Sequence, residues 1–276
     1  MEFGADNLFQ PLRDVIVAKP LYFDIATLET PWQKAWFGKI NRQLAIRQHE
    51  AMCAALEAEG VRCHFLSPVK DDPDQKDTRD VGIISSKGAI VASQKHMEVK
   101  RGEANAFIEF CKRHDIPVLN RYRSIQFEGG DFFFLDEDTA IMGVGARTGQ
   151  EGALAVRELL NKEDFQILPH QVAHHLDGAF NIISKEMAVL DERYINVGDF
   201  PYLKDQRIIS VSKEDPMTMP ANFLLLRENK ILADAGCHAF NQKLANEGVE
   251  VIEVDVSELK KNGGGIRCMT LPVLRK

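Results

Sequence analysis

Cys268 is the residue whose type and setting best suit covalent chemistry. It stands just after the triple glycine Gly263 to Gly265. Glycines let a backbone approach a ligand closely and adopt dihedral angles that other residues avoid. A thiol on such a loop, with a histidine supplied from elsewhere in the fold, is a candidate nucleophile. Cys53, Cys63 and Cys111 lie in amphipathic helical or strand contexts, where a free cysteine is usually a small buried hydrophobe.

Acidic, basic and imidazole side chains gather where the chain leads into apolar strand pairs. Each one alone would ordinarily be a solvated turn residue or a cap, but together they recur at corresponding points of successive segments. These residues are Asp74, Asp77, Arg79 and Asp80 before one pair, Glu128 and Asp131 at a second, and His174, His175 and Asp177 before a third.

The elements that would position these residues repeat along the chain. Each repeat has an apolar strand, a polar turn and a second apolar strand, followed by a helical pattern and one more strand. The strand pairs are Val81 to Ser93, Gly129 to Val144, Phe180 to Leu190 and Phe223 to Ala235. The helical patterns are Glu98 to His114, Thr148 to Lys162 and His238 to Gly248, and the strands after them are IPVL, FQIL and VEVIEV.

The amino-terminal segment matches this unit with one strand missing. It has a strand at Asp14 to Pro20, one long helical pattern from Trp32 to Gly60 and the strand VRCHFL. The missing strand is expected at Cys268 to Leu274, because a circular array of repeats often closes by pairing its first and last strands.

Five such units predict an α/β protein built as a five-bladed ββαβ propeller with pseudo-symmetry, in a single domain of residues 1–276. Its centre would gather strand ends from all five units into one cavity. The alternative is a two-layer α/β sandwich in which the likeness of the strand pairs is accidental.

Composition limits the class of function. A net charge of -7 disfavours a dedicated nucleic-acid binder and suits a small cationic substrate. Five cysteines without CxxC spacing argue against a disulfide framework and a thiolate zinc site. Neither a stretch of about 20 apolar residues nor a leader pattern occurs, so we expect a cytoplasmic protein without membrane contact.

Two cofactor motifs can be set aside. GVGARTG, Gly143 to Gly149, has its third glycine one residue late for a dinucleotide-binding loop. His170 and His174 have the spacing of a zinc helix, but the glutamate of that motif is absent and the segment leads into a strand. We therefore expect no metal and no organic cofactor.

Three segments resemble a known family: FEGGD (Phe127 to Asp131), HLDGAFNII (His175 to Ile183) and GGGIRCMTLPVLR (Gly263 to Arg275). They are similar to the guanidine-modifying branch of the pentein superfamily, which holds arginine deiminases, dimethylarginine dimethylaminohydrolases and amidinotransferases. PLRDVIVAKP, TRD, KRGE and ARTGQEGA support the resemblance in the same order along the chain. It implies one pentein catalytic domain with the five-fold ββαβ fold.

The resemblance also implies roles for individual residues. Cys268 would be the nucleophile, His175 the general acid and base, and Glu128 the partner of the histidine. Asp80 and Asp177 would bind the guanidinium of the substrate. Arg147 would bind its carboxylate, with Arg101 as a second arginine there, and Asp74 would also bind the substrate.

The chemistry of a guanidinium agrees with these roles. The group is planar and cationic, and its N–H fork suits carboxylates in its plane, which leaves its faces open to a thiolate. Attack would give a thiouronium on sulfur, which water would then hydrolyse. A free thiol has a pKa of about 8.5, so the cationic substrate or a protonated His175 would favour the thiolate.

The substrate is the point where alternatives remain. Asp80 together with Asp177 favours an unsubstituted guanidinium and an arginine deiminase-like reaction that gives citrulline and ammonia. Three features are closer to dimethylarginine dimethylaminohydrolases than to arginine deiminases: the short chain, Asp74, and Val81 where arginine deiminases commonly have a proline. An amidinotransferase, which passes the amidino group to an amine, is the other alternative. The expected partners are a small guanidino compound and a second copy in a homodimer.

Overall fold

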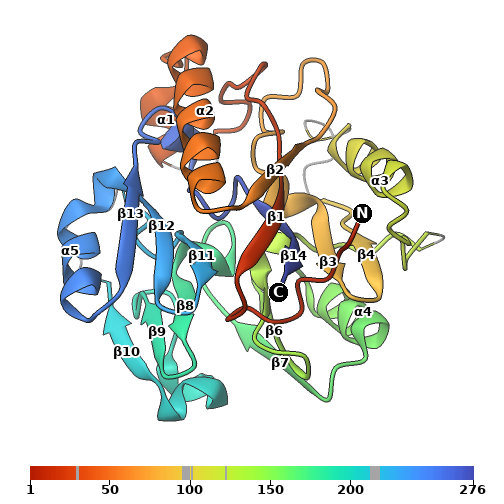
Figure 1. Cartoon of the computed structure of the whole chain (residues 1–276), viewed down its shortest axis with the longest axis vertical. Coiled ribbons are helices and arrows are strands. Elements are labelled where there is room, and N and C mark those ends of the chain that lie inside the picture. The colour runs from red at the N-terminus through yellow and green to blue at the C-terminus, as the bar shows by residue number, and fades with distance from the viewer. Residues whose placement is uncertain (29–30, 95–99, 101, 122, 212–217) are drawn as a thin grey trace.

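Five small β-sheets form the framework of the chain, and helices lie around their outer rim (Figure 1). The computed structural model describes residues 1–28, 31–94, 100, 102–121, 123–211 and 218–276. The helices are α1 (Pro31–Trp36), α2 (Arg42–Ala58), α3 (Glu103–Arg113), α4 (Gln150–Leu160) and α5 (His238–Asn246). The mixed α/β class predicted from the sequence is confirmed.

The predicted strand pairs come in the expected order, but 3₁₀ turns at Val197–Asp199 and Pro201–Asp205 stand where the third repeat would have its helix. Most strands are short. They are β1 (Leu12–Val17), β2 (Arg62–Phe65), β3 (Gly82–Ser85), β4 (Gly88–Val91), β5 (Phe132–Phe134), β6 (Thr139–Val144), β7 (Asp164–Pro169), β8 (Phe180–Ser184), β9 (Met187–Leu190), β10 (Arg207–Ser210), β11 (Leu224–Arg227), β12 (Lys230–Asp234), β13 (Glu250–Val254) and β14 (Leu271–Arg275).

Four of the sheets have one topology. In each, the middle strand pairs antiparallel with one neighbour and parallel with the other, as β6 does with β5 and β7. The same holds for β9 between β8 and β10, for β12 between β11 and β13, and for β1 between β14 and β2. All four predicted strand pairs form as antiparallel pairs.

The first and last strands share a sheet, as predicted. β14 pairs antiparallel with β1, with Leu12 opposite Arg275 and Ile16 opposite Leu271. The amino-terminal arm adds a second contact, because the Gly4 N–H donates to the Val273 carbonyl at 2.7 Å. The two chain ends therefore lie near each other (Figure 1).

The predicted strand IPVL is wrong. The sheet of β3 and β4 has two strands, and residue Val118 forms an isolated parallel bridge with Ala89. The Pro117 carbonyl accepts from the Ala89 N–H at 2.8 Å. Pro117 itself has no N–H, so it cannot continue the ladder.

The long helical pattern from Trp32 to Gly60 is interrupted, which the sequence reading missed. It forms α1 and α2, separated by residues 37–41. Gly38 in this break has φ 69°, a left-handed conformation that favours glycine. Asn41 then caps α2, since its side chain accepts from the Leu44 N–H at 3.1 Å.

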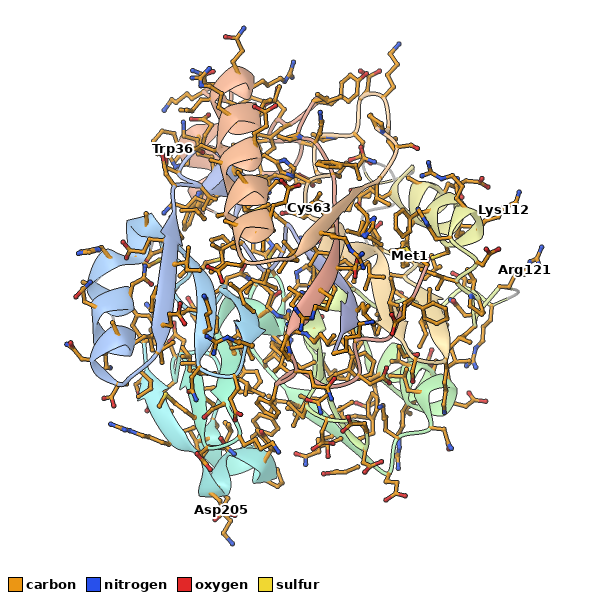
Figure 2. All side chains as sticks on the ribbon, in the orientation of Figure 1. Met1, Trp36, Cys63, Lys112, Arg121 and Asp205 are labelled. Atoms are coloured by element: carbon orange, nitrogen blue, oxygen red, sulfur yellow. The ribbon has the colours of Figure 1, made fainter. Side chains whose placement is uncertain are left out.

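Apolar residues fill the spaces between the sheets and the helices. They form five clusters, of which one joins β1, α2, β11 and β12, and another joins β3, β4, α3 and β14. Charged side chains such as Lys112 and Asp205 project from the outer edge (Figure 2). Within the described ranges, no helix combines the length and apolarity that a membrane crossing requires.

Candidate active site

The residues predicted to do chemistry lie where the chain enters the first strand of successive sheets. Asp80 lies in the 3₁₀ turn Thr78–Val81 before β3, and Glu128 directly precedes the turn Gly129–Asp131 before β5. Asp177 lies in the turn Leu176–Gly178 before β8, and His175 directly precedes it. Cys268 comes shortly before β14.

The approaches to β3, β8 and β14 meet at one cavity of about 490 Å³. Its lining includes the predicted residues Asp74, Asp80, Arg147, His175, Asp177 and Cys268. Glu128 lies behind His175 and is fully buried. Arg101 falls outside the described residues.

His175 and Glu128 form a buried ion pair. The His175 Nε2 lies 2.7 Å from the Glu128 Oε2, and its Nδ1 lies 3.6 Å from the Asp80 Oδ1. Burial alone would lower the pKa of His175, but the charges of Asp80 and Glu128 outweigh it and raise the pKa to about 10. Burial opposes ionisation of Glu128 as well, yet its hydrogen bond to His175 and the nearby cations hold its pKa below the ordinary value. His175 is therefore a protonated acid at neutral pH.

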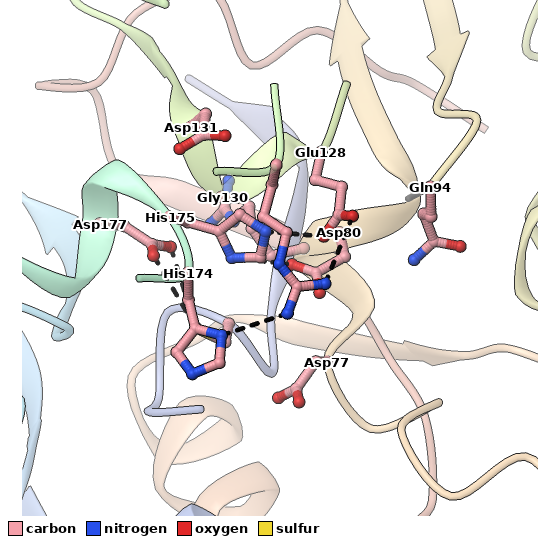
Figure 3. Close-up of polar contacts among 12 residues, drawn as sticks. Asp77, Asp80, Gln94, Glu128, Gly130, Asp131, His174, His175 and Asp177 are labelled. Atoms are coloured by element: carbon pink, nitrogen blue, oxygen red, sulfur yellow. Dashed lines mark hydrogen bonds and ion pairs between the residues drawn. The ribbon is translucent and has the colours of Figure 1, made fainter. Parts of the chain in front are cut away.

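Asp80 faces both Lys100 and His175. Lys100, itself buried, donates to the Asp80 Oδ2 at 2.8 Å. The Asp80 Oδ1 is buried without a hydrogen-bond partner among the described residues. Figure 3 shows the side chains of Asp80, Glu128 and His175 turned toward one another. The Asp80 Oδ1 thus faces the imidazole of His175 without forming a hydrogen bond to it.

Asp177 is held by Arg267, the residue before Cys268. The Arg267 Nη1 donates to the Asp177 Oδ2 at 2.7 Å, and its Nη2 donates to the Phe132 carbonyl at 2.7 Å. The same guanidinium stacks 3.8 Å from the centre of the Phe133 ring. Burial raises the pKa of Asp177, and the charge of Arg267 opposes this.

The Cys268 thiol lies beside Asp177 in a buried setting. Its Sγ is 3.9 Å from the Asp177 Oδ1. Burial, and after it the carboxylates of Asp177, Asp77 and Asp80, raise the pKa of Cys268 well above its ordinary value. These surroundings favour the neutral thiol, and the positive charge of a bound cation would oppose the effect of the carboxylates on Cys268.

Arg147 and Asp74 line other parts of the cavity. The Arg147 Nη2 donates to the His174 Nδ1 at 3.3 Å, and its Nη1 lies 3.8 Å from the Glu128 Oε1. Burial lowers the pKa of His174 to about 4, so this imidazole is neutral and can accept. Asp74 accepts a hydrogen bond from Asn262.

A metal could in principle use the same cluster, because ligand atoms of Asp80, Glu128 and His175 lie within 4.8 Å of one another. Each carboxylate, however, already faces a cation, Lys100 for Asp80 and His175 for Glu128. The arrangement thus favours proton transfer and the binding of an organic cation with N–H donors.

Sequence reasoning missed the residues that support the predicted ones. Lys100 and Arg267 neutralise the two aspartates, and Asn222 contacts the sulfur of Cys268. Asn222 precedes β11 at the place where Asp80 precedes β3. Its position in the repeat was the signal that could have identified it.

Comparison with known proteins decides the family. The family model described as N,N dimethylarginine dimethylhydrolase, eukaryotic, matches residues 21–275. The chain belongs to this family. It is thus part of the guanidine-modifying pentein superfamily, as the sequence motifs predicted, and it is a hydrolase of guanidino C–N bonds.

Relatives of the family cover almost the whole chain. The uncharacterised protein YkgA of Bacillus subtilis is 30% identical over 270 residues, which are 96% of this chain and 92% of YkgA. The dimethylarginine dimethylaminohydrolase of Pseudomonas aeruginosa is 27% identical over 237 residues, which are 85% of this chain and 90% of that enzyme.

Solved structures show the same fold. A dimethylarginine dimethylaminohydrolase bound to 4-chloro-2-hydroxymethylpyridine has a TM-score of 0.77 and 25% identity, and the match covers 95% of this chain and 99% of that one. The N-terminal domain of ArgZ, a cyanobacterial arginine dihydrolase, has a TM-score of 0.85 at 20% identity, with 95% and 97% covered.

Proposed function

We propose that the chain hydrolyses the guanidinium of arginine to citrulline and ammonia, with Cys268 as the nucleophile. The observation that carries this proposal is the position of Asp177, whose Oδ1 lies 3.9 Å from the Cys268 Sγ. A guanidinium whose carbon lies over the sulfur would direct N–H groups at this carboxylate.

The two aspartates favour unsubstituted nitrogens. Asp80 and Asp177 each bind a cation of the chain through Oδ2. Their Oδ1 atoms are left to accept N–H groups in the plane of the substrate. A methyl group in place of such an N–H would press against a buried acceptor and leave it unpaired. Arginine therefore fits this rim better than a methylated arginine.

The reaction begins when the substrate brings its positive charge into the cavity and lowers the pKa of Cys268. The thiol loses its proton to solvent, and the thiolate forms a bond with the guanidino carbon from one face of the plane. Protonated His175 gives its proton to one terminal nitrogen, which leaves as ammonia. The rest of arginine stays on the sulfur as a thiouronium.

Water completes the cycle. His175, now neutral, takes a proton from a water molecule, which adds to the same carbon. The second tetrahedral species expels the thiolate and, after losing a proton, becomes citrulline. Glu128 stabilises the imidazolium before and after the cycle, since it lies 2.7 Å from the His175 Nε2. Arg147 would bind the substrate carboxylate, with Arg101 as a second arginine at that group. Asp74 would contact the substrate near these arginines.

A methylated arginine is the second candidate, because the matching family model is the one for dimethylarginine hydrolysis. Its chemistry would be the same, except that a methylated amine would leave in place of ammonia. An amidinotransferase would instead release ornithine and pass the amidino group to an amine.

One assay separates these reactions. The purified chain is incubated with arginine, with arginine plus glycine, and with dimethylarginine, and the products are identified by chromatography. We expect citrulline and ammonia from arginine. Dimethylamine formed from dimethylarginine, with no reaction of arginine, would support the second candidate. Ornithine formed only when glycine is added would indicate a transferase. Ornithine and ammonia formed from arginine would indicate a dihydrolase. Cys268→Ser should abolish turnover and keep the fold, and retained activity would refute the role of the thiol.

We also propose that the five sheets are the blades of one propeller within a single domain of residues 1–276. The shared strand order supports this, as does the pairing of β14 with β1. A ring would explain why the approaches to β3, β8 and β14 meet at one cavity.

A further inference from the structure

Asn222 lies at the remaining strand approach, two residues before β11. Its side chain is buried, with 3% of the residue exposed, and it borders the cavity that Cys268 and Asp177 also line. Its side chain makes four hydrogen bonds, two of them to Cys268.

The Asn222 amide has one orientation that satisfies its neighbours. Its Oδ1 accepts from the backbone N–H of Arg267 at 3.0 Å and from that of Cys268 at 3.3 Å. Its Nδ2 donates to the Asp177 carbonyl at 3.1 Å and to the Cys268 Sγ at 3.2 Å. Because backbone donors occupy the oxygen side, the NH₂ group must face the sulfur.

The loop before Cys268 is shaped to reach this amide. A Cβ on Gly265 would lie 2.5 Å from the Asn222 Oδ1, so a side chain there would push the loop away. The third glycine of the GGG run thus serves the contact between Asn222 and the Cys268 backbone.

The negative charges around the sulfur disfavour a thiolate, so a hydrogen-bond donor to the sulfur would help to stabilise it. The carboxylates of Asp177, Asp77 and Asp80 face the thiol and oppose its ionisation. Arg79 is a nearby cation, but its Nε points to the Arg267 carbonyl at 3.4 Å. Arg267 itself binds Asp177, and Lys76 binds Asp77. His175 borders the same cavity and binds Glu128.

We propose that Asn222 is a catalytic residue that donates a hydrogen bond to the Cys268 thiolate and stabilises it when the substrate binds. This inference rests on the proposed role of Cys268 as the nucleophile. A hydrogen bond to an ionised acceptor is stronger than one to a neutral acceptor, so the amide stabilises the thiolate more than the thiol. Because Asn222 also donates to the Asp177 carbonyl, it fixes the position of the Cys268 sulfur relative to Asp177.

The test compares Asn222→Ala with Asn181→Ala. Asn181 is a matched control, because it is equally buried and its Nδ2 donates to the carbonyls of Ala221 at 2.7 Å and Phe223 at 2.8 Å. Its removal disturbs the backbone on both sides of Asn222 but leaves the donor to the sulfur. The readouts are kcat and the rate of Cys268 alkylation by iodoacetamide between about pH 7 and 10, followed by mass spectrometry of the Cys268 peptide.

We expect Asn222→Ala to slow Cys268 alkylation about 10- to 100-fold at each pH where the thiol is mostly protonated, and to lower kcat with it. Asn181→Ala should alkylate much closer to the wild-type rate. Equal rates in the two variants would overturn the inference, because they would show a structural role or none. An active Cys268→Ser enzyme would instead refute the proposed function.

A second variant keeps the test valid if Asn222→Ala does not fold. Asn222→Asp retains an oxygen for the two backbone N–H groups and replaces the NH₂ donor by a second oxygen. The alkylation rate should again fall, and a wild-type rate in the folded variant would overturn the proposal.

Discussion

At the scale of single residues, the cavity is close to electrically balanced before a substrate arrives. Asp77, Asp80 and Asp177 each bind one cation of the chain, namely Lys76, Lys100 and Arg267. Glu128 binds His175. A guanidinium therefore adds one positive charge to a balanced site, and loss of the thiol proton compensates for it. Under the proposed mechanism, the substrate therefore helps to create the thiolate that attacks it.

The charge of Glu128 should set the alkaline limit of activity. Asp80 and Glu128 raise the pKa of His175 to about 10, so the proton it donates is lost only as pH rises through that value. In Glu128→Gln the alkaline limb of kcat/KM should move down by at least about one pH unit. The exposed Glu158, paired with Arg123, gives the control Glu158→Gln. Coincident profiles for the wild type and Glu128→Gln would contradict this role.

Motifs identified the candidate catalytic residues but not the side chains that contact them. Cys268, His175 and Glu128 stand in recognisable local segments. Lys100 lies 20 residues from Asp80, and Arg267 lies 90 residues from Asp177, so only the folded chain brings each pair together. A pattern in one sequence carries no such distance information, and Arg267 has no neighbour along the chain that indicates its partner.

At the scale of elements, the strand approaches place the site. Short 3₁₀ turns lead into β3, β5 and β8, and glycines let these turns come close. A Cβ on Gly129 would lie 2.2 Å from the Arg79 carbonyl oxygen, and one on Gly130 would lie 2.6 Å from the His175 ring. Glycine is thus required where the turn before one strand packs against the turn before the next strand.

Gly130→Ala should therefore displace the His175 ring from Glu128 and reduce kcat by at least about tenfold, since catalysis depends on the position of the acid. Gly149→Ala is the control, because a Cβ there would meet nothing within 4 Å. Steady-state kinetics on both folded variants provides the check. A Gly130→Ala enzyme as active as Gly149→Ala would show that the ring tolerates the added methyl group.

The strand pairs were predictable because apolar runs around polar turns specify local hairpins. Two predicted elements differ in the structure because of single residues that hydrophobic periodicity does not take into account. Pro117 limits the expected strand IPVL to one bridge, and Gly38 with Asn41 divides the first helical pattern. In both cases a single residue's backbone preference outweighed the pattern.

At the scale of the whole molecule, closure depends on the carboxyl-terminal strand. β14 joins β1 and carries Leu271 into the cluster of Ile16, Ile84 and Phe107. Cys268 lies three residues before this strand, so the same pairing that joins the chain ends also positions the Cys268 thiol. The expected homodimer and cytoplasmic location stay predictions.

Leu271→Ala should lower the free energy of unfolding by about 2–5 kcal/mol, because it leaves a cavity in a buried cluster. Leu154→Ala, at a side chain that is 45% exposed on α4, should change it by only about 0.5 kcal/mol. Denaturant unfolding measures both values. Similar losses in the two variants would show that β14 does not contribute to the core in this way.

The most direct test of the central claim is to trap the covalent intermediate. The enzyme is mixed with arginine, quenched in acid during turnover, digested and analysed by mass spectrometry. The account predicts that the Cys268 peptide gains the mass of arginine less one ammonia, whereas an amidinotransferase would add the amidino group alone. Turnover with an unmodified Cys268 peptide, or with the adduct on another residue, would contradict it.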